Sequence, residues 1–314
     1  MSALFTIIAP VFLIVGFGYL VAWRGLFREG AVDGLMVFAQ NFAAPTLLFV
    51  SMARLDLGAE FRPALLLPFY AGAFSSFALG WAGARFLFAR PPVDCVAIGF
   101  VCLFSNSLLL GIPITERAYG PDSLSGNWAI IAVHSPLLYT FGITVMEFTR
   151  AHGSGLSVGR VALRAATGVI RTPLVIGILS GMAVNVLQQA GLAMPDAFWA
   201  ASDMIAGSAL PAALFGLGGI LHRYRPEGDM GAIAMCCACS LLVHPGIVYG
   251  LGRIADLDDA GLRSAVMTAA MAPGVNAYLF ANLYGAAKRV AATSVLVGTA
   301  LSVLSIGMWL AILP

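Results

Sequence analysis

The chain has 314 residues, of which 60% are hydrophobic and only 10% are charged, and its formal net charge is +2. Soluble domains have about 45–50% apolar and about 25% charged residues, so a water-soluble fold would lack the charge needed to cover its surface. The composition therefore predicts a protein whose main solvent is lipid, and the scattered basic residues give no sign of nucleic-acid binding. The five cysteines all fall inside apolar stretches, which predicts neither a disulfide framework nor a metal site, and we expect no cofactor.

Ten apolar segments approach the roughly 20 residues that a membrane-spanning helix needs. The predicted spans are 2–22, 32–53, 63–84, 93–115, 127–147, 172–193, 200–221, 230–252, 263–283 and 290–313. No basic residue precedes the first apolar run, so we expect a true span there and not a cleavable signal. The prediction is an all-α membrane protein with ten transmembrane helices, divided by a basic cytoplasmic linker over 148–171 that lies at the membrane surface.

Orientation follows from the distribution of Lys and Arg between the loops. With the N-terminus outside, 12 of the 17 basic residues fall in cytoplasmic loops and five in outer loops. This bias predicts a multi-pass inner-membrane protein with both termini in the periplasm.

The two halves of the sequence, 1–147 and 172–314, resemble each other in where their prolines fall. Since five spans is an odd number, the second repeat would enter the membrane inverted, an arrangement typical of secondary transporters. The paired positions are Pro10 with Pro173, Pro45 with Pro211, and Pro113 with Pro273, at offsets of 163, 166 and 160 residues.

Spans 4 and 9 each combine a Pro/Gly break with an asparagine at membrane depth. Span 4 contains the segment 105–113 with Asn106, and span 9 contains the segment 272–276 with Asn276. Bare backbone groups are costly in hydrocarbon, so such breaks are expected to face protein or a watery cavity. The half-helix that restarts after a break offers free N–H groups and a positive dipole end, which suits an anion. The alternative is a simple proline kink whose asparagine bonds to a neighbouring helix.

Four stretches carry a resemblance to a known family: 41–51 (NFAAPTLLFVS), 105–120 (SNSLLLGIPITERAYG), 210–219 (LPAALFGLGG) and 272–285 (APGVNAYLFANLYG). The pattern resembles the auxin efflux carrier family, which includes plant PIN carriers and bacterial malate- and malonate-type permeases. The resemblance implies a scaffold of spans 1, 2, 6 and 7, able to form a homodimer, and a transport domain of spans 3–5 and 8–10. It also implies a small organic carboxylate as substrate, bound where spans 4 and 9 cross. The implied binding residues are Asn106, Gly111, Pro113, Pro273, Gly274 and Asn276, faced by Pro45 and Pro211 of the scaffold.

One departure from that pattern concerns the start of span 8, where we would expect a basic residue. The chain has Met235 and three cysteines there, and the nearest ionisable group is His244. The group that balances the substrate's charge is therefore not assigned by the resemblance.

Ionisable groups at membrane depth are costly and suggest function. His134 and His244 are the deepest, and each is either a proton-coupling group or a neutral imidazole that donates to a backbone carbonyl. Asn41 and Asp203 are candidate cation ligands, although Asp203 also fits a hydrated carboxylate at the outer interface. Sodium coupling is disfavoured because neither break contains a carboxylate, and Glu147 is interpreted as an interface residue.

The sequence thus predicts a secondary carrier for a small organic carboxylate. The alternatives are a proton- or sodium-coupled transporter of another small solute, or an anion channel. An enzyme is disfavoured, because the histidines lack the partners of a helical metal motif and no Gly-rich phosphate loop is present.

Overall fold

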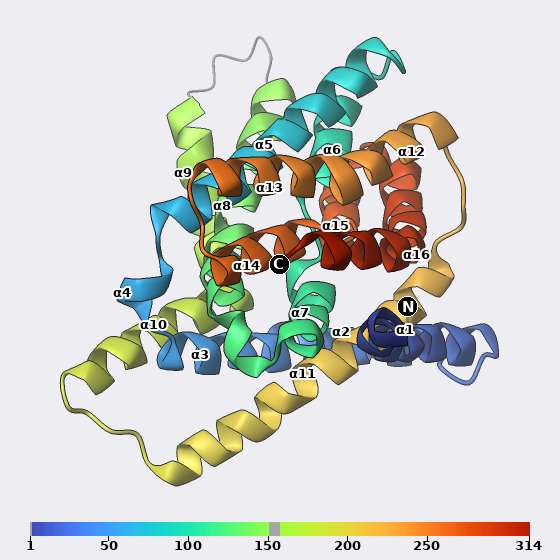
Figure 1. The fold of residues 1–314 in the computed structure, drawn as a ribbon. Coiled ribbons are helices and arrows are strands. Elements are labelled where there is room, and N and C mark those ends of the chain that lie inside the picture. Colours follow the sequence, from blue (N-terminus) through green and yellow to red (C-terminus); the bar gives the residue numbers. More distant parts are fainter. Residues whose placement is uncertain (1, 151–157) are drawn as a thin grey trace.

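The computed structural model describes residues 2–150 and 158–314, and Figure 1 shows that this part of the chain is built of helices, without any β-strand. The first half contains α1 (Ser2–Trp23), α2 (Glu29–Phe38), α3 (Ala44–Arg54), α4 (Leu57–Glu60), α5 (Pro63–Phe86), α6 (Pro92–Leu103), α7 (Ile112–Tyr119) and α8 (Ser125–Arg150). The second half contains α9 (Val158–Ile170), α10 (Pro173–Gln189), α11 (Asp196–Arg223), α12 (Met230–Ala238), α13 (His244–Ile254), α14 (Asp259–Ala269), α15 (Val275–Tyr284) and α16 (Lys288–Ile312).

Seven helical segments of the described chain are long and apolar enough to cross a membrane. They are Thr6–Trp23, Glu29–Arg54, Pro63–Phe86, Pro121–Arg150, Asp196–Arg223, Met230–Ile254 and Lys288–Ile312. The predicted span 172–193 falls on α10, which has 17 residues. The predicted spans 93–115 and 263–283 each fall on two shorter helices separated by an interruption.

Three π-helical segments lie within these helices: η1 (Ala39–Ala43), η2 (Ser107–Gly111) and η4 (Cys239–Val243). Each is followed by an α-helix whose second residue is a proline, namely Pro45, Pro113 or Pro245. Proline lacks an N–H and displaces the carbonyl four residues before it. A wider π turn accommodates that defect without ending the helix.

Two helix pairs approach closely because glycines remove side chains from their contacts. A Cβ atom on Gly18 of α1 would collide with the carbonyl oxygen of Phe215 in α11, and one on Gly177 of α10 would collide with that of Pro45 in α3. Small residues allow such close contact between helices in lipid, where the hydrophobic effect does not drive association. The first pair joins the first predicted span to the seventh, and the second joins the sixth to the second.

The helices form two groups. In Figure 1, α1, α2, α3, α10 and α11 lie along the lower side of the view, and α5, α6 and α12–α16 lie above them. At the centre of the upper group, residues 95–103 of α6 are all buried, and Phe100 stacks on Phe280 of α15 with ring centroids 4.0 Å apart. The interruptions after α6 and α14 lie in this upper group, at its boundary with the lower one.

Candidate binding cavity

The two interrupted helices meet at their interruptions, where Ser105 and Pro273 form an isolated antiparallel bridge. The N–H of Asn106 donates to the carbonyl of Ala272 at 2.8 Å, and the N–H of Gly274 donates to the carbonyl of Phe104 at 2.9 Å. Unpaired backbone groups cost several kcal/mol in a membrane interior. Each interruption therefore survives because the other supplies its hydrogen-bond partners.

A helical segment restarts after each interruption and presents its first turn to the same space. After the first interruption η2 begins at Ser107, and after the second α15 begins at Val275. The first N–H groups of a helix have no partners within the helix, and together with the dipole they give that end a partial positive charge. Two such ends therefore converge on one place.

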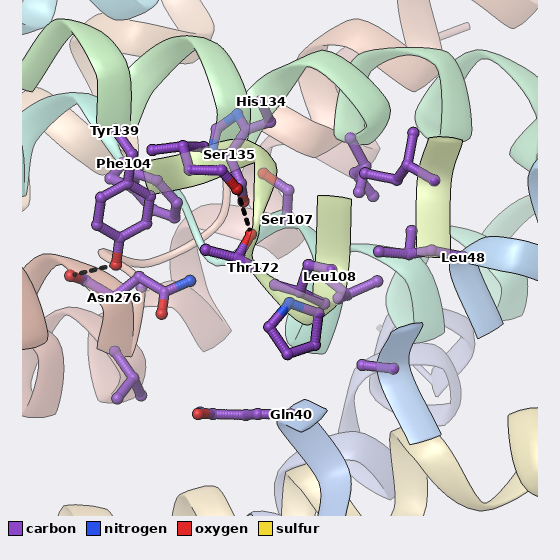
Figure 2. A pocket seen from close by; sticks show the side chains of 18 of the residues that line it. Gln40, Leu48, Phe104, Ser107, Leu108, His134, Ser135, Tyr139, Thr172 and Asn276 are labelled. Atoms are coloured by element: carbon purple, nitrogen blue, oxygen red, sulfur yellow. Dashed lines mark hydrogen bonds between the residues drawn. The ribbon is translucent and has the colours of Figure 1, made fainter. Parts of the chain in front are cut away.

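That place is a cavity of about 720 Å³ between the two helix groups (Figure 2). One wall is the crossing itself, and another is a face of α8 whose lining residues recur every fourth position from Ile131 to Glu147. The remaining walls come from the lower group, with Gln40, Asn41 and Leu48 from the η1–α3 region and residues 172–174 at the start of α10. Figure 2 shows Gln40 across the cavity from Tyr139 and Asn276.

The two predicted asparagines both line the cavity, but their surroundings differ. Asn106 is only 6% exposed, and its side-chain Nδ2 has no hydrogen-bond partner among the described residues. Asn276 is half-buried, and its backbone carbonyl accepts a hydrogen bond from the Tyr139 hydroxyl at 3.2 Å (Figure 2). A buried donor without a partner costs about 1–3 kcal/mol. The Asn106 amide is therefore a hydrogen-bond donor that a ligand in the cavity could satisfy.

The two predicted histidines both pack against Phe69, with ring centroids 5.7 Å and 5.2 Å from it, and only His134 lines the cavity. His134 is 3% exposed, and neither ring nitrogen has a hydrogen-bond partner among the described residues, although the Ser105 backbone lies beside the ring. His244 is fully buried in α13, with Nε2 3.4 Å from the carbonyl oxygen of Phe69. His244 therefore matches the alternative of an imidazole bonded to a backbone carbonyl, whereas His134 has the Ser105 backbone beside a ring that also faces the cavity.

The structure corrects the position predicted for the first break. The sequence predicts the break at Gly111 and Pro113. In the structure, helical hydrogen bonding is interrupted at Phe104–Asn106, resumes at Ser107 and continues through Pro113. Proline at the second position of α7 follows a π turn, so its missing N–H does not interrupt the helix. The residue opposite Pro273 is Ser105 and not Pro113.

Of the other predicted binding residues, some line the cavity and others do not. Gly274 lines the cavity, whereas Gly111, Pro113, Pro273, Pro45 and Pro211 are not among the residues that line it. Pro273 is buried in the crossing, Pro45 is buried where α3 meets Gly177, and Pro211 is exposed on α11. The structure thus brings together Asn106, Gly274, Asn276, His134 and Asn41, and places the prolines in supporting positions.

The two candidate cation ligands do not lie together. Asn41 lines the cavity, but Asp203 lies outside it and accepts a hydrogen bond from Arg54 at 2.8 Å. Both side chains of this ion pair are about half exposed. This environment matches the alternative of an interfacial carboxylate for Asp203.

The linker contributes to the cavity, which the sequence analysis missed. Its residues 158–170 form α9, which packs against α8, and Arg160 and Val169 of α9 line the cavity; residues 151–157 lie outside the described residues. Glu147, interpreted as an interface residue, also lines it. Arg160 and Glu147 are the only charged residues among the described lining, so the part near the crossing holds neutral polar groups and helix ends.

An all-helical arrangement with seven segments of the described chain apolar enough to span a membrane, and a cavity where two interrupted helices cross, has the features of a membrane transporter. Comparison with known proteins gives the family. The family model described as "Membrane transport protein" matches residues 3–156 and 156–310, and the chain belongs to this family, the auxin efflux carrier family.

Individual relatives are distant, and two of the three described here match along nearly the whole chain. The "Putative malonate transporter" of Rhizobium meliloti (strain 1021) is 24% identical over 98% of this chain and 94% of its own length. The "Uncharacterized transporter YfdV" of Escherichia coli (strain K12) is 22% identical over 96% of this chain and 95% of its own. The "Probable auxin efflux carrier component 3b" of rice (Oryza sativa subsp. japonica) is 28% identical over 45% of this chain and 24% of its own length.

Proposed function

We propose that this protein is a secondary carrier that moves a small organic carboxylate across the inner membrane by alternating access. The main support for this proposal is that two half-helix N-termini and the unpartnered Asn106 amide all face one cavity. Free N–H groups, positive dipole ends and an amide donor together favour a carboxylate without a fixed cation beside it. A permanently charged arginine at that depth would be costly to bury unpaired.

The proposed architecture is ten spans in two inverted five-span repeats. Two helix contacts support it, α1 with α11 (spans 1 and 7) and α3 with α10 (spans 2 and 6). In an inverted repeat span 1 corresponds to span 6 and span 2 to span 7, so these two contacts are equivalent. The lower helix group would be the scaffold, through which a homodimer would form, and the upper group would be the transport domain. Rocking of one group against the other would expose the cavity to either side of the membrane.

The proposed substrate class draws on two further observations. The cavity of about 720 Å³ lies in the range of small-molecule sites. One relative is named for malonate and another for auxin, and both compounds carry carboxylate groups. A small carboxylate is therefore the substrate class we propose, with a dicarboxylate such as malonate as the first candidate.

Ligand-induced stabilisation of the purified protein tests the substrate class. We expect at least one of acetate, pyruvate, malonate, succinate, malate or indole-3-acetate to raise the unfolding temperature. A ligand at a hundred times its Kd adds about 2.7 kcal/mol to the stability of the form that binds it. The uncharged diamide of malonate, which has the same shape, is the matched control for malonate. No stabilisation by any acid, or equal stabilisation by the diamide, would contradict an anion site.

Counterflow in proteoliposomes separates a carrier from a channel. Proteoliposomes that contain the carrier and are preloaded with unlabelled substrate should accumulate labelled substrate transiently, because each labelled molecule that enters is exchanged for an unlabelled molecule that leaves. A channel would only let the label equilibrate.

Topology is tested by reporter fusions. A reporter active only in the periplasm should be active at either terminus and silent when inserted within residues 153–165. An active reporter in that segment would reverse the orientation and remove the basis for the inverted repeat.

A further inference from the structure

His134 is a buried imidazole in the wall of the cavity, and among the described residues the backbone of Ser105 is the one polar group placed beside its ring. Its ring lies edge-on to Phe104, with centroids 4.7 Å apart, and next to Phe69 at 5.7 Å. Both ring nitrogens are buried without a hydrogen bond of good geometry, and since the Ser105 backbone can serve only one of them, at least one ring nitrogen is unpaired among the described residues. Buried polar groups are bonded in the great majority of cases, so an unpaired one at a binding cavity needs an explanation.

Among the described residues, no group packed against the ring carries a fixed charge. Phe69 and Phe104 contact it, and the titratable groups beside these two rings are Tyr70, Tyr139 and His244. Charged groups on the helices packed against α8, such as Arg54, Asp94 and Asp259, lie in the first or last turn of their helices. The Tyr70 hydroxyl donates to the Ile130 carbonyl at 2.8 Å and the Tyr139 hydroxyl donates to Asn276, so neither is an anion. Glu147 lies thirteen residues further along α8, about 20 Å at 1.5 Å per residue. Arg160, the other charged lining residue, has the wrong sign.

These surroundings disfavour a proton and an anion when either arrives alone. Without an anion, a protonated His134 would be a buried cation beside two positive helix ends. With a carboxylate bound at Asn106 and the start of α15, that cation gains a countercharge. Each ligand therefore supplies what the other lacks, which makes their binding mutually favourable.

We infer that His134 is the binding site for a proton that is carried together with the carboxylate, so that the protein is a proton–carboxylate symporter. This inference rests on the proposed function and adds the coupling ion to it. One proton travels with each substrate molecule. A monocarboxylate would cross without net charge, and a dicarboxylate dianion would cross with one net negative charge.

His244 provides a matched control because its ring packs against the same phenylalanine, Phe69, at a similar distance. It is buried, lies outside the cavity lining and has Nε2 within reach of the Phe69 carbonyl. His244→Gln removes an equally deep imidazole but leaves the cavity wall intact. The comparison of His134→Gln with His244→Gln thus separates proton binding in the cavity from general loss of a buried histidine.

The test counts protons taken up when malonate binds to the purified protein, by titration calorimetry in buffers of different ionisation enthalpy. The titrations are run at a pH well above the ionisation range of malonate itself. We expect uptake close to one proton for the wild type and for His244→Gln, and none for His134→Gln. We also expect a protonated site to strengthen malonate binding by about 5–150-fold, the usual range of coupling between two ligands, and this pH dependence should vanish in His134→Gln.

Proton flux in proteoliposomes completes the test, with an internal pH dye and labelled malonate. Wild type and His244→Gln should acidify the lumen as malonate enters, whereas His134→Gln should retain counterflow without acidification. Proton uptake that persists in His134→Gln, or that is lost in His244→Gln alone, overturns the assignment while leaving the carboxylate site intact. Failure of the wild type to bind malonate or any other acid of the panel overturns the proposed function and the inference with it. If His134→Gln does not fold, His134→Asn is measured in the same titrations.

Discussion

The two interruptions of the crossing share a backbone pattern but differ in how their side chains are satisfied. At the second, Pro273 is buried against α16 and the Asn276 carbonyl is held by Tyr139. At the first, the chain continues into a π turn and leaves the Asn106 amide buried and unpartnered. The difference indicates that the second interruption is held in place by the protein, whereas the first keeps a hydrogen-bond donor free for a ligand.

Replacing each asparagine tests that difference, and the largest effect is expected at Asn106. Asn106→Ala should weaken carboxylate binding by about ten- to a hundred-fold, since a hydrogen bond to a charged group contributes roughly 1.5–3 kcal/mol. Asn276→Ala should weaken it less, because the Asn276 side chain is only half-buried and water can replace part of its hydrogen bonding. Affinities from calorimetry or ligand-induced stabilisation measure both.

Asn185 is the matched control for these two substitutions. Its Nδ2 donates to the carbonyl oxygens of Met52, Ala53 and Leu55 at 3.1, 3.1 and 2.7 Å, so this buried amide is fully used within the protein. Asn185→Ala should lower stability without changing the affinity of the folded protein. Equal affinity losses in Asn276→Ala and Asn106→Ala, or a failure of Asn106→Ala to fold, would contradict the conclusion that the first interruption keeps its donor for a ligand and the second does not.

A second prediction concerns the support of Pro273. A Cβ atom on Gly298 of α16 would lie 2.7 Å from Pro273 Cδ, in a rigid ring, whereas one on Gly111 would lie 3.3 Å from Cγ of the flexible Met271. Overpacking typically costs about 1–3 kcal/mol. Thermal unfolding should therefore show Gly298→Ala destabilised by about that amount and Gly111→Ala nearly unchanged. A stable Gly298→Ala would mean that Pro273 is free to move.

A smaller effect is expected when the Tyr139 hydroxyl, which bonds to the second interruption, is removed. Tyr139→Phe removes the bond to the Asn276 carbonyl and should lower the free energy of unfolding by about 0.5–1.5 kcal/mol. Tyr70→Phe removes a hydroxyl bond to Ile130 of similar kind, and Tyr70 does not line the cavity. Both variants should lose similar stability, and only Tyr139→Phe should alter carboxylate affinity. An affinity change in Tyr70→Phe alone would refute the role given to Tyr139.

Much of the helical framework could be predicted from the sequence. Long apolar runs locate helices because lipid leaves no other partner for the backbone, and the predicted windows fall on helices of the structure. The interrupted spans were also identified, since Pro and Gly weaken helices locally. Asn106, Gly274, Asn276, His134 and Asn41, all candidate site residues from the sequence, line the cavity, and their roles in binding stay predictions.

What could not be predicted depends on contacts between distant residues. The segment Phe104–Asn106 contains neither proline nor glycine, and it leaves the helix because Ala272 and Gly274 supply its partners. Glu147 follows Ile131 in a four-residue spacing that indicates a stripe winding around α8 by about 40° per step, and this stripe lines the cavity. The spacing of Val161, Ala165 and Val169 likewise indicates a helix with one apolar face in the linker.

Pro113 gives the most direct test of where the first interruption lies. If the break were at Pro113, as its sequence suggests, Pro113→Ala would restore a continuous helix and abolish binding. In the structure Pro113 is not in the cavity lining, and the break is fixed by the paired backbone of Asn106 and Ala272. A proline at a compatible position stabilises a protein by about 0.4–1 kcal/mol through the unfolded chain. Pro113→Ala should therefore cost about that much in unfolding free energy and leave carboxylate affinity within about threefold of the wild type, well below the effect of Asn106→Ala. A tenfold or larger loss of affinity with intact folding would show that the π turn before Pro113, and not the crossing, sets the position of the Asn106 amide.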